Sequence, residues 1–183
     1  MLLLRQFTES ERLKLRALEP EDLDLIYQWE NDTQVWEISN TIFPYSKYIL
    51  RKYLDNAHLD IFQVKQQRLM IDLKSNPGPI SIGTIDLFDF EPFHNRIGIG
   101  ILIKEIKYRG KGYAKEALNL TVNYLFQILK VHQVYCNITK DNEISLNLFQ
   151  SIGFEIAGEK KDWLKTTKGW KNEYLLQLIN KNN

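Results

Sequence analysis

The sequence has very little of what disulfide-bonded or metal-binding proteins need. Of its 183 residues, one is cysteine (Cys136) and three are histidine. A disulfide within the chain is therefore impossible, and a reducing compartment is favoured. The histidines are scattered without the spacing of metal ligands, so we expect no metal site. Cys136 alternates with Val134 and Ile138, which predicts a buried apolar position.

Long apolar runs and an excess of one charge are also missing. The opening Met-Leu-Leu-Leu turns polar at Arg5, so it is far too short for a signal peptide or a membrane span. We therefore expect a cytoplasmic protein that does not bind membranes. Lysine and arginine number 24 against 23 aspartates and glutamates, which gives a net charge of +1. This balance argues against a dedicated nucleic-acid-binding protein, because such proteins depend on clustered basic side chains.

Length and hydrophobic content predict one globular domain over residues 1–183. The chain is 44% hydrophobic and 26% charged, as ordinary globular domains are. A chain of this size buries roughly 70% of its unfolded surface, so it needs no covalent or metal cross-link for stability. No repeat, linker or low-complexity segment divides it.

Apolar periodicity predicts one strand, two helices and three further strands in the first part of the chain. The strand is expected at 12–17, and the helices at about 19–30 and 46–56. An irregular segment rich in aromatic residues, 35–45, separates the helices. Strands at 67–74, 80–88 and 96–103 follow, and we predict that they form an antiparallel meander.

The second part of the chain alternates between strand and helix. We predict a helix from 112 to about 130, a strand at 133–139, a helix ending near 152, and closing strands at 154–159 and 173–179. A strand, a helix and a strand in succession imply a parallel pair with a right-handed crossover. The whole is predicted to be one mixed α/β sheet, mostly antiparallel, and ligands favour the carboxyl ends of strands in such sheets.

A glycine-rich turn between strand and helix is the strongest local signal. In residues 109–114, Gly110 and Gly112 let the backbone approach an anion closely. The free amides and the dipole of the following helix favour negative charge, and Arg109 and Lys111 add positive charges. The turn therefore suits a pyrophosphate.

Three other interpretations of this turn compete with a pyrophosphate site. A nucleoside-triphosphate loop needs Ser or Thr after its Gly-Lys, whereas Tyr113 follows Gly112 here. A dinucleotide fingerprint needs a third glycine, which is missing. A plain glycine turn with two surface cations stays open on this motif alone.

Two motifs together resemble the GNAT superfamily of acyl-CoA N-acyltransferases. The first is Arg109-x-x-Gly112-x-Ala114, in the expected context between strand and helix. The second is Asn142-x-x-Ser145, followed by Phe149 and then by Ile-Gly-Phe. The opening residues 13–31 and the tail 169–174 are similar to the branch of spermidine and ribosomal-protein N-acetyltransferases.

This resemblance implies the fold, the cofactor and the residues that bind it. The expected fold is a single domain with a splayed parallel strand pair and flanking helices. The cofactor is acetyl-CoA, whose acetyl group passes directly to an amine bound beside it. Backbone groups on the splayed strand would contact the pantetheine arm, the turn would bind the pyrophosphate, and the later helix would also touch the cofactor. The implied cofactor-binding residues are Ile101, Leu102, Ile103, Arg109, Gly110, Lys111, Gly112, Tyr113, Ala114, Asn142, Ser145 and Phe149.

The sequence departs from the family at the position of the general acid. Many relatives have a tyrosine where this chain has Phe149, and phenylalanine cannot donate a proton. Some also have a glutamate on the splayed strand, near Gly98 or Gly100. Ser145 is the predicted catalytic residue, acting through water. Asn142 as a helix cap and Ser145 as a surface hydroxyl are the structural alternatives.

The acceptor amine is not encoded in a readable motif. We predict that Glu30, Trp36 and Asp86 bind it, with Asp32 and Glu37 as further acids for a polycation. Two other acids, Asp89 and Glu91, are further candidates for binding or deprotonating the amine. Three hypotheses remain open: a small-amine acetyltransferase, with a polyamine as one candidate acceptor; an acetyltransferase for a protein or peptide α-amine; and an acyl-CoA-binding module with little catalysis. A homodimer is also expected to be possible.

Overall fold

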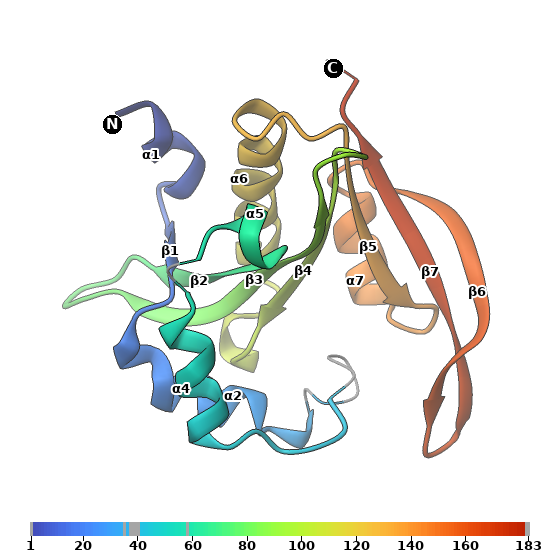
Figure 1. Ribbon diagram of the computed structural model, residues 1–183, viewed down its shortest axis with the longest axis horizontal. Coiled ribbons are helices and arrows are strands. Elements are labelled where there is room, and N and C mark those ends of the chain that lie inside the picture. The colour runs from blue at the N-terminus through green and yellow to red at the C-terminus, as the bar shows by residue number, and fades with distance from the viewer. Residues whose placement is uncertain (1, 35, 37–40, 58, 182–183) are drawn as a thin grey trace.

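Figure 1 shows the computed structural model, which describes residues 2–34, 36, 41–57 and 59–181. Its centre is a seven-stranded sheet in the order β1-β2-β3-β4-β5-β7-β6. The strands are β1 (Leu13–Ala17), β2 (Gln67–Leu73), β3 (Ile80–Glu91), β4 (Arg96–Ile103), β5 (Gln133–Thr139), β6 (Glu155–Thr166) and β7 (Gly169–Ile179). Only β4 and β5 pair in parallel. The predicted mixed, mostly antiparallel sheet is confirmed.

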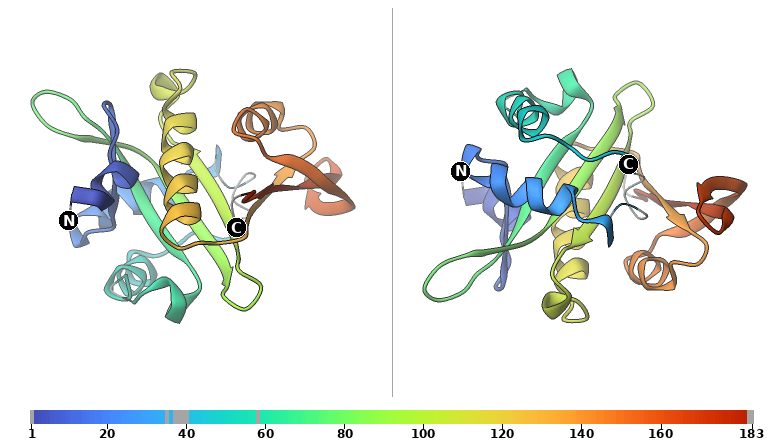
Figure 2. Two further views of the ribbon diagram at one scale, coloured as in Figure 1. Left: turned by 90° about the horizontal axis from the view of Figure 1, so that it is seen from above. Right: turned by 90° about the horizontal axis from the view of Figure 1, so that it is seen from below.

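Helices cover both faces of the half of the sheet that contains β1 to β4 (Figure 2). These helices are α1 (Leu2–Thr8), α2 (Leu23–Glu30), α4 (Lys47–Asp55), α5 (Ile61–Val64) and α6 (Tyr113–Gln127), with 3-10 turns at Pro20–Asp22 and Ile106–Tyr108. The helix α7 (Glu143–Gln150) lies beside β5 and β7 on the other half of the sheet (Figure 1). Successive residues of a strand face opposite sides of the sheet. Ile71 of β2 therefore packs in the core under α6, whereas Met70 packs with Ile26 and Leu50 under α2 and α4. Within the described residues, no helix is long and apolar enough to cross a membrane.

Several boundaries differ from those predicted. The closing strands form one long hairpin, paired from Glu155–Gln177 out to Thr166–Gly169, where we expected a loop between 159 and 169. Frequent charged residues hide the apolar alternation of this hairpin. The helices α1 and α5 were not predicted, because seven and four residues are too few to show a helical period. The helix α6 ends at Gln127, shortly before the expected Lys130.

The strands β4 and β5 separate soon after they meet. Their parallel pairing covers three residue pairs, Arg96–Gln133, Ile97–Val134 and Gly98–Tyr135. Beyond this point β4 runs on to Ile103 and β5 to Thr139, although both strands are fully described. The predicted splay of the parallel pair is therefore present, and it opens toward the carboxyl ends of both strands.

A buried ion-pair network joins β1 to the start of α2. The guanidinium of Arg16 donates to both carboxylate oxygens of Asp22, at 2.6 and 2.8 Å, and to Asp72 at 2.7 Å. Burial opposes ionisation of Asp22, but Arg16 and the backbone N–H of Glu19 outweigh it, so the pKa of Asp22 is lowered. These ion pairs thus connect β1, β2 and the start of α2.

This network predicts acid-sensitive stability. Because the pKa of Asp22 is lower in the folded than in the unfolded state, its contribution is complete above pH about 4 and is lost as pH falls through the folded pKa. We expect Asp22→Asn to lower the free energy of unfolding by about 3 kcal/mol at pH 7, because Arg16 loses its paired charge. Urea titrations at pH 7 and pH 3.5 should show the gap between variant and wild type narrowing in acid. The exposed Asp24→Asn is the control and should change stability little at either pH. An equal gap at both pH values would contradict the argument.

Candidate functional site

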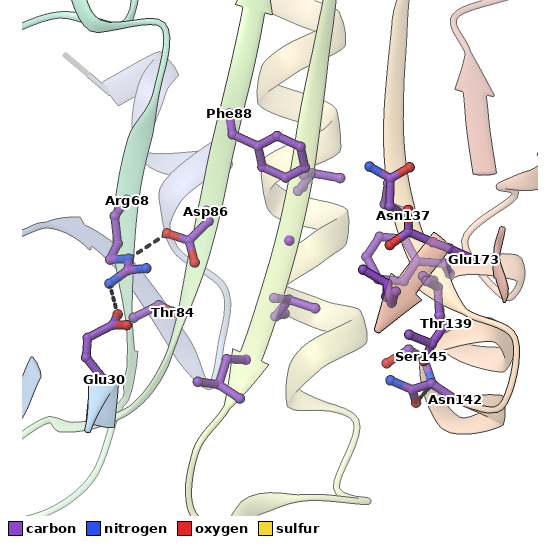
Figure 3. A pocket seen from close by; sticks show the side chains of 18 of the residues that line it. Glu30, Arg68, Thr84, Asp86, Phe88, Asn137, Thr139, Asn142, Ser145 and Glu173 are labelled. Atoms are coloured by element: carbon purple, nitrogen blue, oxygen red, sulfur yellow. Dashed lines mark hydrogen bonds and ion pairs between the residues drawn. The ribbon is translucent and has the colours of Figure 1, made fainter. Parts of the chain in front are cut away.

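A cavity of about 640 Å³ occupies the opening between β4 and β5. Figure 3 shows its two walls, with β2 and β3 on one side and β5 with α7 on the other. The β4 segment that lines it includes Ile101 and Leu102, two of the predicted backbone positions, whereas Ile103 is buried just beyond. Asn142, Ser145 and Phe149 line the opposite wall. Residues of the splayed strand and of the motif that begins at Asn142 therefore line one cavity, whereas none of residues 109–114 is among its lining residues.

The glycine turn lies between β4 and α6. Gly110 and Gly112 have φ values of 72° and 81°, which favour glycine strongly. Gly112 is the N-cap of α6 and makes no side-chain capping bond, so the amides of the first helical turn have no capping side chain. No atom lies within 4 Å of where a Cβ at Gly110 would be. The backbone is therefore accessible to an anion, as the motif predicts.

The side chain of Arg109 is directed at the backbone. Its Nε donates to the carbonyl oxygen of Ile103 and its Nη2 to that of Lys104, both at 2.9 Å. Arg109 therefore fastens the turn to the end of β4, in addition to bringing a positive charge. Lys111 is exposed, and Tyr113 and Ala114 are half-buried in the first turn of α6.

A second arginine, Arg12, supports the turn and was not predicted. Arg12 donates from Nη1 to the carbonyl oxygen of Lys111 at 3.1 Å and from Nε to Glu116 at 2.8 Å. Its guanidinium also lies over the ring of Tyr113, 4.8 Å from the centroid. Arg12 precedes β1 and is 99 residues from Lys111 in sequence, so no local pattern pointed to it.

We expect Arg12→Gln to weaken binding at the turn. Glutamine loses the ion pair with Glu116 and the stacking on Tyr113, so the turn is held less firmly. Because Arg12 is partly exposed, the expected effect is about 3- to 10-fold in the dissociation constant for coenzyme A. Calorimetric titration measures it, and Lys14→Gln, an exposed cation on β1, is the control. Equal affinities for the two variants would show that Arg12 has no such role.

The start of α7 contributes amide and hydroxyl groups to the cavity. The side-chain oxygen of Asn142 accepts a hydrogen bond from the backbone N–H of Ser145 at 3.1 Å, so Asn142 is a helix cap and also lines the cavity. Phe149 is 4% exposed and packs edge-on against Phe154. Burial raises the pKa of the Cys136 thiol, which also lines the cavity, so this thiol stays protonated.

The wall on the side of β2 and β3 contains two carboxylates joined by an arginine. Arg68 donates from Nε to Asp86 at 2.5 Å and forms an ion pair with Glu30 through Nη1 (Figure 3). Burial opposes the charge on Arg68, but the two carboxylates outweigh it and raise its pKa. Glu30 and Asp86 were predicted separately; the structure brings them together, and Arg68 was not predicted.

The other acceptor candidates that the structure describes do not line the cavity. The indole of Trp36 donates to the carbonyl oxygen of Glu30 at 2.7 Å, and Trp36 is not among the residues that line the cavity. Asp32 pairs with Lys104, which lowers the pKa of Asp32. Asp89 accepts from the hydroxyl of Tyr135 at 3.2 Å. Neither Asp89 nor Glu91 lines the cavity, and Glu37 lies outside the described residues.

The hairpin β6–β7 adds a third group of polar side chains. Lys160 donates to Asn137 and to Glu173, both at 2.8 Å, and all three line the cavity. These roles were not predicted, because Lys160 fell in the expected loop, whereas Asn137 and Glu173 lay in expected strands without a motif to mark them.

Comparison with known proteins identifies the family. A model of the acetyltransferase (GNAT) domain matches residues 12–155, which include both walls of the cavity and the glycine turn. The chain is a GNAT acetyltransferase. The acetyltransferase is 28% identical over 150 residues to spermidine N(1)-acetyltransferase of Escherichia coli, which covers 82% of this chain and 76% of the relative. It is 30% identical over 165 residues to an N-acetyltransferase 9-like protein of Nematostella vectensis, covering 90% and 69%.

Solved structures share the fold of this acetyltransferase. The spermidine N-acetyltransferase of Vibrio cholerae, solved with CoA and spermine, superposes with a TM-score of 0.80 over 93% of this chain and 96% of that one, at 23% identity. The acetyl donor is acetyl-CoA. The residues present fit it: the positive-φ glycines leave the start of α6 accessible to a pyrophosphate, and the splay leaves the edge of β4 beside a cavity.

Proposed function

We propose that this acetyltransferase transfers acetyl from acetyl-CoA to a primary amine of a small molecule, with a polyamine as the first candidate. Both reactants bind together, and the transfer is direct. The main support is that one cavity has the predicted cofactor-binding residues Ser145 and Phe149 on one wall. The predicted acceptor-binding residues Glu30 and Asp86 lie on the other wall. This arrangement would let the acetyl thioester and the amine meet in one cavity.

The charge of the cavity wall that contains Glu30, Arg68 and Asp86, here called the acceptor wall, supports an amine as the acetyl acceptor. Two carboxylates, Glu30 and Asp86, share one guanidinium, that of Arg68, so the wall has one negative charge in excess. Carboxylates in a partly closed cavity attract an ammonium group more strongly than they do in bulk water. The E. coli relative and the V. cholerae structure, whose names refer to spermidine and spermine, point to the same class of acceptor.

Within this proposal, each group of residues has one task. The glycine turn, fastened by Arg109 and Arg12, holds the pyrophosphate, and the edge of β4 at Ile101 to Ile103 aligns the pantetheine arm. The capped start of α7, with Asn142 and Ser145, closes the other side. When bound, acetyl-CoA supplies an activated acetyl thioester. The chain orients the amine and excludes water.

A panel of acceptors tests the proposal. Purified protein is incubated with acetyl-CoA and spermidine, spermine, a monoamine, or a peptide with a free α-amine, and thiol release and product mass are followed. We expect turnover with at least one polyamine. Turnover only with the peptide would favour the protein-acetyltransferase alternative, and cofactor binding without any turnover would favour the binding module. Either result would overturn the polyamine proposal.

Asp86→Asn tests the role of the acceptor wall. Asparagine still accepts a hydrogen bond from Arg68 but lacks the charge, so we expect the KM for a polyamine to rise about 10-fold while kcat changes little. Steady-state kinetics at saturating acetyl-CoA measures this, and the melting temperature checks folding. Asp89→Asn, outside the cavity, is the matched control. An unchanged KM in Asp86→Asn would remove Asp86 from the acceptor site.

Self-association remains a prediction. One similar structure, that of the V. cholerae enzyme, is described as dodecameric, which supports an oligomer here without defining its size.

A further inference from the structure

Three polar side chains lie in a row across the hairpin side of the cavity. In the register of the sheet, Thr139 of β5 faces Glu173 of β7, and Glu173 faces Lys160 of β6. All three line the cavity, together with Phe149. The row lies at the carboxyl end of β5, on the wall that faces β4 across the splay.

The ion pair between Lys160 and Glu173 is held in place by further contacts of Lys160. Lys160 donates to Glu173 at 2.8 Å and to Asn137 at 2.8 Å, and its ammonium lies 5.0 Å from the ring centre of Trp163. The side chain of Glu173 is 8% exposed and that of Lys160 is 30% exposed. A buried carboxylate thus faces a cation that still reaches the open part of the cavity.

Acetyl transfer to an amine requires one proton to move from nitrogen to sulfur. A C–N bond forms and a C–S bond breaks, so the nitrogen must lose a proton and the thiolate must gain one. Phe149 has no proton to give. Burial keeps the thiol of Cys136 protonated, since its pKa is raised. Arg68 stays protonated and is held by Glu30 and Asp86.

We propose that Lys160 and Glu173, rather than the predicted Ser145, form the proton-transfer pair of this enzyme, in place of the tyrosine that Phe149 replaces. Glu173 accepts the proton from the attacking nitrogen, and Lys160 donates one to the departing sulfur. A proton then passes from Glu173 to Lys160 across their hydrogen bond. Both groups return to their starting charges, so no outside acid or base is consumed. This inference rests on the proposed transfer to an amine.

The first test uses binding alone. If Lys160 faces the sulfur, its charge should lower the pKa of the thiol in bound coenzyme A by about one unit from its ordinary value of about 8.5. Ultraviolet titration of the thiolate at saturating coenzyme A measures this, with S-methyl-coenzyme A as the blank. We expect the shift to vanish in Lys160→Met and to persist in Lys161→Met, an exposed lysine that does not line the cavity. The same shift in Lys160→Met and wild type would overturn the proposal.

The second test separates charge from proton donation. Lys160→Arg keeps the ion pair and the positive charge, but arginine does not release its proton in proteins. We therefore expect Lys160→Arg to keep the lowered thiol pKa and yet to lose about 10- to 100-fold in kcat. Full kcat in this variant would overturn the proton-transfer role.

A double-mutant comparison completes the design. Glu173→Gln and Lys160→Met should each lower kcat about 10- to 100-fold, and the double variant should be no slower than the slower single variant, because the two act as a unit. Unchanged coenzyme A affinity would show that the loss lies in the chemical step. Because Lys160→Met leaves the buried Glu173 without its partner and should lower the melting temperature, kcat is compared at a temperature at which every variant is folded. Additive losses would contradict a shared path. If the wild type acetylates no amine, the proposed function fails, whereas the thiol titration still decides whether Lys160 faces the sulfur.

Discussion

Replacing Gly112 with valine is expected to weaken coenzyme A binding by at least about 100-fold. Gly112 has φ 81° at the first turn of α6, a conformation that costs a β-branched residue about 1–3 kcal/mol. An added Cβ would also lie 3.5 Å from Nη2 of Arg12, which braces the same turn. The turn must then either move or carry a side chain where the anion approaches. Both outcomes remove amides from the pyrophosphate.

The control for this variant should carry the same strain at a distant position. Gly169 has φ 118° in the turn between β6 and β7, with no atom within 4 Å of a Cβ built there. Gly169→Val should therefore lose stability without losing affinity. Calorimetric titration with coenzyme A, together with a melting curve for each variant, separates the two effects. Wild-type affinity in Gly112→Val would mean that the turn does not bind the cofactor.

Gly83→Ala is expected to cause the largest loss of stability. A Cβ at this position of β3 would lie 1.9 Å from the carbonyl oxygen of Leu102 in β4, a contact that no side-chain rotation can relieve. The two strands would have to separate in the middle of the sheet. We expect a loss of at least about 3 kcal/mol, at or beyond the usual range for overpacking, and a fall in melting temperature of roughly 6–12 °C.

The same substitution should also affect the site, because Leu102 lines the cavity. Any protein that still folds is expected to bind coenzyme A more weakly. Gly158→Ala in β6 is the matched control, since nothing lies within 4 Å of a Cβ there. If thermal melting showed equal stability for the two variants, the close approach of β3 and β4 would be disproved.

The central strands and the glycine turn were predictable from sequence because each is encoded locally. The strands at 96–103 and 133–139 agree with the structure at both ends, since their apolar alternation is uninterrupted. The glycine turn could be recognised because its positive φ values favour glycine, and glycine is visible in the sequence. Asn142 likewise caps α7, as its position before the apolar run predicts.

The side chains that complete the site could not be predicted in the same way. Arg68 joins Glu30 to Asp86, and Arg12 reaches Lys111, only because strand register brings distant residues together. A single sequence does not contain that register. The pair Lys160 and Glu173 was hidden because charged residues interrupt the pattern of the hairpin. The individual roles of the cofactor and acceptor residues stay predictions until the variants are measured.

The short pairing between β4 and β5 also affects the stability of the enzyme without its cofactor. Only three residue pairs of the described strands β4 and β5 connect the β1–β4 half of the sheet to the β5–β7 half, so the pairing between the two halves is weakest beside the cavity. A cofactor lying between β4 and β5 would contact both halves of the sheet. Its binding would stabilise the folded state by mass action. The loaded enzyme would then be the more rigid form, and release of coenzyme A after each turnover would loosen the molecule where the next acceptor must enter.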